Sequence, residues 1–294
     1  MLRNRNKLFC DLHPACYAIS LQKEICKRHI KNWLDNITGK VKIAKATQEK
    51  RLPNVVSSFS SNLIKRGQGI DAELQTNKVT NIMLACEKIN RITLYPGETF
   101  SFWACVGKIT KKKGYKHGRV IQRNVIKAGI GGGLCNLGNT IHLLILHSPL
   151  EVTEFHSHSD ALAPEEGARV PFSSGTSVFY NNIDYRFKNN TSQMMQLLVW
   201  CDDEKLYGEL RSEREFSGHY NLVEENHRFV KESGKYYRLS KIYKETVDRL
   251  TGEVIERALV LDNHSEVMYD YALLPDAQLC EEDRPVNDEE FMEA

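Results

Sequence analysis

A glycine-rich stretch that runs directly into an apolar segment constrains this chain more than any other feature. Residues 128–149 read AGIGGGLCNLGNTIHLLILHSP. The apolar residues from Leu134 to Ile145 recur at three- and four-residue spacing, as they do on one face of a helix. Because proline cannot continue a helix, the helix ends before Pro149. The spacing therefore predicts a helix that carries Cys135 in its first turn.

A helix start changes the chemistry of a cysteine. Its free amides and the positive end of the helix dipole favour a thiolate, which lowers the thiol pKa and makes Cys135 a candidate nucleophile. Gly131, Gly132 and Gly133 would let an acyl group approach the backbone, whose amides could form an oxyanion hole. One alternative is a small buried cysteine beside a turn. Phosphate binding is disfavoured, because the run lacks both the P-loop ending and the dinucleotide fingerprint.

Two histidines after the predicted helix are candidate bases for the thiol. His156 and His158 lie two residues apart in EVTEFHSHS, so on a strand both would point to the same side. The pair could instead ligate a metal together with Cys135, but no fourth ligand stands at a recognisable spacing. We therefore expect an acid–base role and no metal.

The run NIDYRFK at residues 182–188 supplies a candidate third group. Tyr185 and Phe187 suit the core side of a strand, which leaves Asp184 and Arg186 on the opposite face. Asp184 could orient a catalytic imidazole from there. The alternative is that Asp184 and Arg186 are solvent-facing charges matched across strands.

Other segments alternate between helical and extended patterns. Apolar residues from Ile19 to Trp33 share one face of a predicted helix, and a second apolar stripe predicts a helix over 77–89. The serine-rich segment 51–68 is predicted to be a loop. Runs at 236–247 and 253–261 flank turn-forming residues and predict a hairpin.

We therefore predict an α+β fold in which the Cys-bearing helix packs on an antiparallel β-sheet. A helical N-terminal lead-in (1–69) precedes a core domain (70–215), and a β-rich C-terminal extension (216–278) follows. Residues 279–294 are acidic and have the composition of a disordered tail.

Composition restricts the partners of this chain of 294 residues. Forty Lys and Arg against 38 Asp and Glu give a net charge of +2, which is too balanced to favour a nucleic-acid partner. The eight cysteines are scattered singly, so the sequence predicts neither a disulfide framework nor a structural metal, and no cofactor is expected. Neither a signal peptide nor a membrane span is predicted, and we expect a cytoplasmic protein. The sequence does not indicate an oligomeric state.

Several short motifs between residues 70 and 200 resemble the VanW family, in its order and at similar spacing. They are PGETFSF from Pro96, GGGLC from Gly131, HSHS from His156 and IDYRFKNNT from Ile183. The resemblance implies L,D-transpeptidase-like acyl transfer on peptidoglycan stem peptides or their precursors, in glycopeptide resistance or cell-wall metabolism.

The resemblance also assigns roles to residues. It implies Cys135 as the acyl acceptor and His158 as its base, with His156 as the alternate. Asn136 stands where the family commonly has Gln, and its amide can still donate hydrogen bonds. Substrate binding is thus predicted at Gly131, Gly132, Gly133, Asn136 and Arg186. The alternative is a non-catalytic binding or accessory protein of the same pathway.

Overall fold

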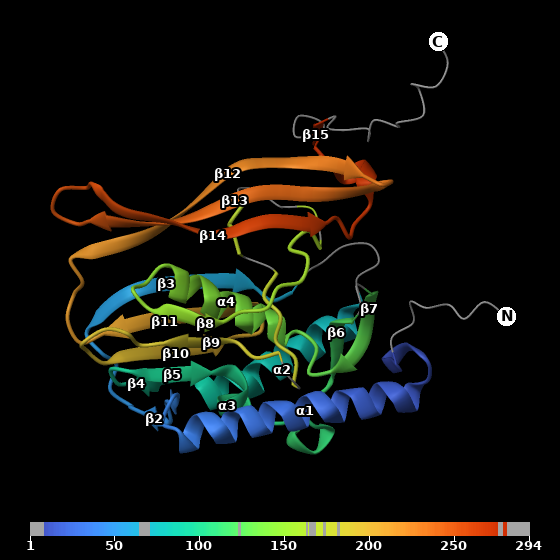
Figure 1. Cartoon of the computed structure of the whole chain (residues 1–294), viewed down its shortest axis with the longest axis horizontal. Coiled ribbons are helices and arrows are strands. Elements are labelled where there is room, and N and C mark those ends of the chain that lie inside the picture. Colours follow the sequence, from blue (N-terminus) through green and yellow to red (C-terminus); the bar gives the residue numbers. More distant parts are fainter. Residues whose placement is uncertain are drawn as a thin grey trace, which may run out of the picture. The chain divides into compact units, whose positions relative to one another are not determined.

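The computed structural model describes residues 9–64, 71–122, 125–162, 164, 169–172, 175–180, 183–275 and 279–280 (Figure 1). It shows the predicted α+β fold. The chain divides into two compact units. Unit 1 comprises residues 1–156 and 177–215, and unit 2 comprises residues 157–176 and 216–294.

Three helices of unit 1 contain the apolar patterns that predict a helix, and the short helix at Phe102–Val106 was not predicted. The helices are α1 (Pro14–Ile37), α2 (Ala72–Ile89), α3 (Phe102–Val106) and α4 (Leu134–Leu146), with short 3₁₀ turns at η1 (Phe9–Asp11) and η2 (Lys111–Lys113). Asp71 caps α2 by accepting a hydrogen bond from the amide of Leu74 at 3.1 Å. None of the helices in the described ranges is both long and apolar enough to cross a membrane.

The larger sheet of unit 1 is antiparallel, in the order β2-β4-β10-β11-β3. Its strands are β2 (Ala46–Thr47), β4 (Ile92–Leu94), β10 (Met195–Cys201), β11 (Lys205–Ser212) and β3 (Asn54–Asn62). Helix α4, whose second residue is Cys135, packs on β3 and β11. The approach is close, because a Cβ atom on Gly208 would lie 2.8 Å from Cδ1 of Leu144.

The smaller sheet of unit 1 has the order β1-β5-β9-β8, with one parallel pair between β1 and β5. Its strands are β1 (Lys42–Ile43), β5 (Glu98–Ser101), β9 (Arg186–Lys188) and β8 (Glu151–Glu154). Phe100 and Phe187 stack in its core at 4.7 Å between ring centroids. A separate hairpin, β6 (His117–Gln122) and β7 (Val125–Ile130), leads directly into the glycine run.

The prediction of a loop over 51–68 is wrong for residues 54–62, which form β3, and residues 65–68 lie outside the described residues. Strand β3 pairs with β11 along its whole length and forms one edge of the larger sheet. Its serines are mostly half-buried or exposed, as an edge strand allows. The buried Ser57 donates a hydrogen bond to the carbonyl of Leu144 at 2.9 Å. A serine-rich composition is therefore compatible with a strand here, because the buried hydroxyl has an acceptor.

Unit 2 is built on an antiparallel meander. Its strands are β12 (Gly218–Glu232), β13 (Lys235–Asp248) and β14 (Val254–Glu266), with β15 (Leu279–Cys280) parallel to β12 and a 3₁₀ turn at η3 (Tyr271–Leu273). A small core joins Ala161, Phe229, Val267 and Leu274. The predicted hairpin is present as β13 and β14, and the C-terminal part is β-rich. Residues 281–294 of the predicted tail lie outside the described residues.

Candidate functional site

The start of α4 is formed by backbone packed against backbone. Gly131 and Gly133 have φ angles of 76° and 101°, in the left-handed region that favours glycine. A Cβ atom on Gly132 would lie 2.1 Å from the carbonyl carbon of Gly118 in β6. A Cβ atom on Gly133 would lie 2.1 Å from Cγ of Lys78 in α2. The glycines thus let the helix start fit between β6 and α2.

Two of the amides predicted to form an oxyanion hole already have acceptors. The amide of Gly131 donates to the carbonyl of Lys116 at 3.0 Å, and that of Gly132 donates to the carbonyl of Gly129 at 3.2 Å. Within the described residues, the amide of Gly133 donates to no acceptor. Gly133 is therefore the backbone donor of this run that is available to a ligand.

Cys135 lies half-buried in the first turn of α4. Its thiol donates to the carbonyl of Val178 at 3.8 Å. Burial raises the pKa of the Cys135 thiol, although backbone hydrogen bonds at Val178 and at Cys135 itself oppose the rise. This direction is opposite to the one predicted from the helix start, because desolvation of the sulfur outweighs the backbone hydrogen bonds that favour the thiolate. The resting side chain is therefore a thiol at neutral pH.

Asn136, the next residue of α4, points toward strand β3. Its Oδ1 accepts a hydrogen bond from the hydroxyl of Ser61 at 3.3 Å. In the described part of the chain its amide nitrogen has no acceptor. Donation from Asn136 to a ligand stays a prediction.

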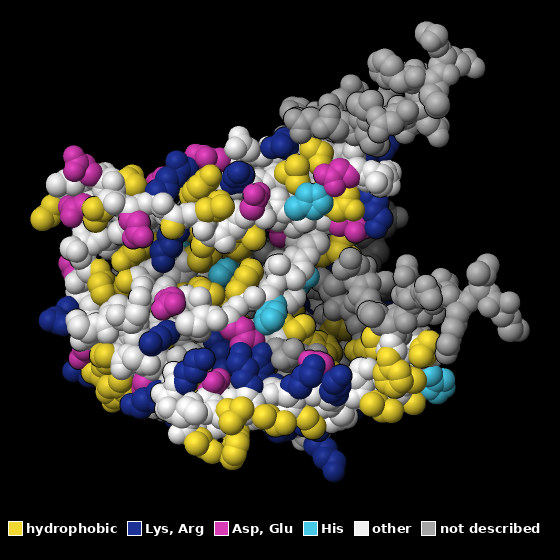
Figure 2. All heavy atoms as spheres, viewed as in Figure 1, with side chains coloured by type: hydrophobic (Ala, Val, Ile, Leu, Met, Phe, Trp, Pro, Cys, Tyr) yellow, Lys and Arg dark blue, Asp and Glu magenta, His cyan; other side chains and the backbone are white. Residues whose placement is uncertain are grey.

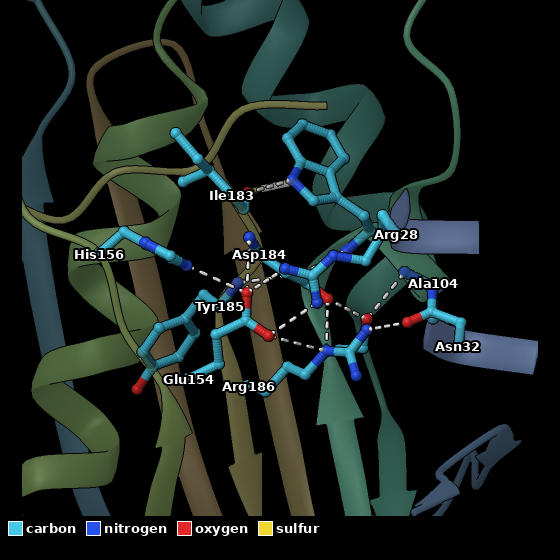
Figure 3. A network of polar contacts seen from close by, with 11 residues as sticks. Arg28, Asn32, Ala104, Glu154, His156, Ile183, Asp184, Tyr185 and Arg186 are labelled. Carbon is cyan, nitrogen blue, oxygen red and sulfur yellow. Dashed lines mark hydrogen bonds and ion pairs between the residues drawn. The ribbon is translucent and has the colours of Figure 1, made fainter. Parts of the chain in front are cut away.

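A second cluster in unit 1, here called the charged network, consists of Arg28, Glu154, Asp184 and Arg186 with the polar groups that bond to them (Figure 3). Asp184 is 2% exposed, and its Oδ2 accepts from the hydroxyl of Ser101 at 2.6 Å and from Nε of Arg186 at 2.7 Å.

The other oxygen of Asp184, Oδ1, accepts from the amides of Trp103 and Tyr185 at 3.1 and 3.0 Å. Among the described residues, no imidazole bonds to Asp184, so the predicted orienting contact is not made. The alternative of solvent-facing charges is wrong as well, because Asp184 and Arg186 are buried and compensate each other.

Glu154, at the end of β8, is the centre of the charged network. Its two oxygens accept from both terminal nitrogens of Arg28, with Nη1 to Oε2 at 2.8 Å. Oε1 lies 3.1 Å from Nε2 of His156, and Oε2 lies 3.5 Å from Nε of Arg186. Burial alone would raise the pKa of Glu154. Hydrogen bonds from Arg28 and His156, with the charges of Arg28 and Arg186, lower that pKa overall.

Helix α1 supplies one side of the charged network. Arg28 is 9% exposed, and Nη2 of Arg186 donates to Oδ1 of Asn32 at 2.7 Å. Burial lowers the pKa of Arg28, but pairing with Glu154 raises it overall. Sequence reasoning missed Arg28, Asn32 and Glu154. The available signal was an acidic residue two positions before His156.

The two candidate histidines are in different environments. Strand β8 ends at Glu154, so strand alternation does not place His156 and His158 on one side. His156 belongs to unit 1, and its side chain is 39% exposed beside Glu154. His158 belongs to unit 2, where its Nδ1 bonds to the carbonyl of Ser159 at 2.7 Å. Burial lowers the pKa of His158, which keeps it neutral at neutral pH.

One short segment connects His156 with Cys135. The amide of Ser177 donates to the carbonyl of His156 at 2.8 Å, and the carbonyl of the next residue, Val178, accepts from the Cys135 thiol. The structure thus places His156 and Cys135 against consecutive residues of the same segment. In the described residues no three His, Cys, Asp or Glu side chains gather as a metal site would require.

Helix α4 is also joined to the charged network. Nδ1 of the buried His142 lies 3.0 Å from the hydroxyl of Tyr185, and the His142 ring stacks on Phe155 at 4.4 Å. The Tyr185 amide in turn bonds to Asp184. The helix that carries Cys135 and the charged network are therefore neighbours within one core.

The fold and this site define an α+β protein with a thiol at a helix start and a carboxylate-paired imidazole in a neighbouring segment. The family model "VanW like protein" matches residues 77–211. The chain is 30% identical over 226 residues to the vancomycin B-type resistance protein VanW of Enterococcus faecalis, which covers 77% of this chain and 82% of that protein. The chain belongs to the VanW family, as its motifs predict.

A second relative matches a shorter stretch. The uncharacterized protein YoaR of Bacillus subtilis is 31% identical over 113 residues, which are 38% of this chain and 36% of that protein. No solved structure matches the fold.

Proposed function

We propose that this protein transfers acyl groups of peptidoglycan stem peptides or their precursors through Cys135, in resistance to vancomycin-type glycopeptides. The biological setting is supported by the identity to a protein named as a vancomycin B-type resistance protein. The chemistry rests on a single observation. The thiol in the first turn of α4 bonds to the carbonyl of Val178, and the preceding residue, Ser177, bonds to the backbone carbonyl of His156, whose imidazole is paired with Glu154. Thiol acyl transfer requires a nucleophile, a base and a group that orients the base.

In the proposed reaction, His156 takes the proton of Cys135 and the sulfur attacks a peptide carbonyl carbon. The C–N bond then breaks, His156 gives its proton to the leaving amine, and a thioester remains on Cys135. An amine or water attacks this thioester, losing its proton to His156. The thiolate leaves and takes that proton back, so the enzyme returns to its starting state.

The raised pKa of Cys135 makes a base necessary for this reaction. His156 suits the role better than His158, which the family resemblance favours, because it lies in the same unit as Cys135. The lowered pKa of Glu154 keeps that carboxylate ionised, and its charge would stabilise the imidazolium that forms. The amide of Gly133 and the side-chain amide of Asn136 are the proposed donors to the carbonyl oxygen.

A non-catalytic accessory protein of the same pathway is the second candidate. Two observations favour it. Burial holds the Cys135 thiol protonated, and in the described part of the chain its hydrogen-bond acceptor is a backbone carbonyl instead of an imidazole. Such a protein would bind stem peptides without forming a covalent adduct.

Intact-mass measurement separates the two candidates. The full chain is incubated with muropeptides that carry tetrapeptide or pentapeptide stems, and the acyl-transfer proposal expects an acyl adduct. Cys135→Ser should abolish this adduct, whereas Cys26→Ser, which removes an exposed thiol of α1, should not. His156→Ala should slow adduct formation more than His158→Ala. Peptide binding without an adduct would favour the accessory role.

A further inference from the structure

The outer face of α1 carries an apolar stripe that is exposed in the structure. Its members are Ile19, Cys26, Ile30, Trp33, Leu34 and Ile37. The exposed fractions of Ile19, Ile30, Trp33 and Ile37 are 59%, 58%, 61% and 61%. Hydrophobic side chains accordingly form a row along the lower edge of Figure 2, where Figure 1 places α1.

The stripe is a face of the helix and not a scatter of apolar residues. With about 3.6 residues per turn, its members fall within an arc of roughly 100°. Arg28 and Asn32 project from the opposite side, into the charged network. Helix α1 is thus fixed to unit 1 by one face while the apolar face remains in contact with solvent. Exposed apolar patches of this kind mark interaction surfaces.

A row of lysines runs beside the stripe. Lys23, Lys27 and Lys31 are exposed and recur at intervals of four residues, so Lys23 lies at the margin of the stripe and each later lysine is turned about 40° further to the same side. Lys27 pairs with Glu24 at 2.7 Å. In the described part of the chain, Lys23 and Lys31 have no carboxylate partner. The stripe therefore lies beside uncompensated positive charge.

Charge complementarity decides what this surface fits. In an antiparallel pair of α1 helices, the lysine rows would face each other and repel. In a parallel pair, the row would face the other flank, where His29 and Asn36 supply no carboxylate. An anionic lipid surface offers both an apolar layer for the stripe and negative headgroups for the lysines. A tryptophan such as Trp33 is also typical of the membrane–water interface.

We propose that the outer face of α1 binds the surface of a bilayer that contains anionic lipids. The helix lies flat, with the stripe at the boundary of headgroups and acyl chains and the lysine row at the headgroups. From Ile19 to Ile37 the stripe is about 27 Å long at 1.5 Å per residue. The inference does not depend on the chemistry of Cys135.

Vesicle sedimentation of the full chain tests this inference. The protein should sediment with phosphatidylcholine vesicles that contain phosphatidylglycerol and stay in the supernatant with phosphatidylcholine alone. Salt should weaken the binding. Each lysine near the surface contributes about a fivefold gain in affinity, so the double variant Lys23→Gln/Lys31→Gln should bind about 25-fold more weakly.

Trp33→Asp tests the apolar part of the surface and should weaken binding by more than about tenfold, because it places a charge in the stripe. Leu250→Asp is the matched control, since Leu250 is 95% exposed in unit 2 and lies outside the proposed surface. Circular dichroism melting checks that each variant is folded. Cys135→Ser should bind vesicles like the unmodified chain, so a failure of the acyl-transfer proposal is distinguishable from a failure of this one.

Two results would overturn the inference. One is the absence of binding to phosphatidylglycerol vesicles, or binding that Trp33→Asp leaves unchanged. The other is a dimer by light scattering that Trp33→Asp converts to a monomer while vesicles bind neither form. The second result would assign the stripe to a second copy of the chain.

Discussion

The start of α4 and the charged network lie in the same unit and are built by different means. The helix start depends on missing side chains, since a Cβ atom on Gly132 would lie 2.1 Å from the backbone of Gly118. The charged network depends on side chains from separate segments. Its two carboxylates compensate its two guanidiniums. Any added atom should therefore damage the helix start, and the loss of a charge should damage the network.

Removal of one charge from the network should have the largest effect. Asp184→Ala removes the acceptor of the Ser101 hydroxyl and of Nε of the buried Arg186, so the free energy of unfolding should fall by about 3–5 kcal/mol. Chemical denaturation measures the change. Glu232→Ala is the control, because its ion pair with His264 is exposed and is worth at most about 1 kcal/mol. Equal losses in the two variants would show that the network does not stabilise unit 1.

Addition of one methyl group at the helix start should cause the next largest loss of stability. Gly132→Ala forces backbone apart where β6 meets the helix start, and we expect a loss of about 1–3 kcal/mol in the free energy of unfolding. Gly218→Ala is a matched control, because a Cβ atom there would lie 3.3 Å from a methyl group of Thr246 and 3.4 Å from the carbonyl oxygen of Val247, far less tightly than at Gly132. If Gly132→Ala is tolerated as well as the control, the close approach of the two backbones is not required.

A smaller effect is expected in the rate at which the Cys135 thiol is alkylated. Burial raises the pKa of Cys135 and shields its sulfur, so iodoacetamide should modify Cys135 several-fold more slowly than the exposed Cys26 at neutral pH. Peptide mapping after a short reaction measures both residues in one sample. The helix-end effect alone predicts the reverse order, and faster modification of Cys135 would mean that it outweighs burial.

The smallest expected effect is the pH dependence of the stability that Glu154 contributes through the charged network. The folded pKa of Glu154 is lowered, so its stabilising contribution is present above its ordinary pKa of 4.5 and is lost as pH falls through the folded value. The stability gap between the unmodified chain and Glu154→Gln should therefore shrink in acid. Thermal melts over a pH series measure this gap, with the exposed Glu253→Gln as control. A gap that stays constant from neutral to acidic pH contradicts the lowered pKa.

Features that depend on residues close together in the sequence could be predicted. The apolar spacing from Leu134 onward gives α4, and paired β-rich runs give the hairpin of β13 and β14. The apolar face of α1 was evident too. The sequence did not reveal that this apolar face points away from unit 1. The opposite face is the one that packs, because Arg28 and Asn32 bond to residues 126 and 154 positions away in the sequence.

The candidate site was only partly predictable for the same reason. Cys135 and its glycines form one continuous motif, whereas the partner of His156 depends on where β8 ends. The direction of the Cys135 pKa depends on burial, which spacing does not reveal. Asp184 was identified as a charged group, but its partners Ser101 and Arg186 meet it only in the folded sheet.

The path of the chain between the two units has a thermodynamic consequence. The polypeptide passes between them at 156/157, 176/177 and 215/216, so residues 157–176 form a loop that leaves unit 1 and returns to it. The bond from the amide of Ser177 to the carbonyl of His156 closes the neck of this loop inside unit 1. Unit 1 therefore bears the entropy cost of closing this loop. A cut after residue 215 would leave that closed loop behind, without the strands with which it folds.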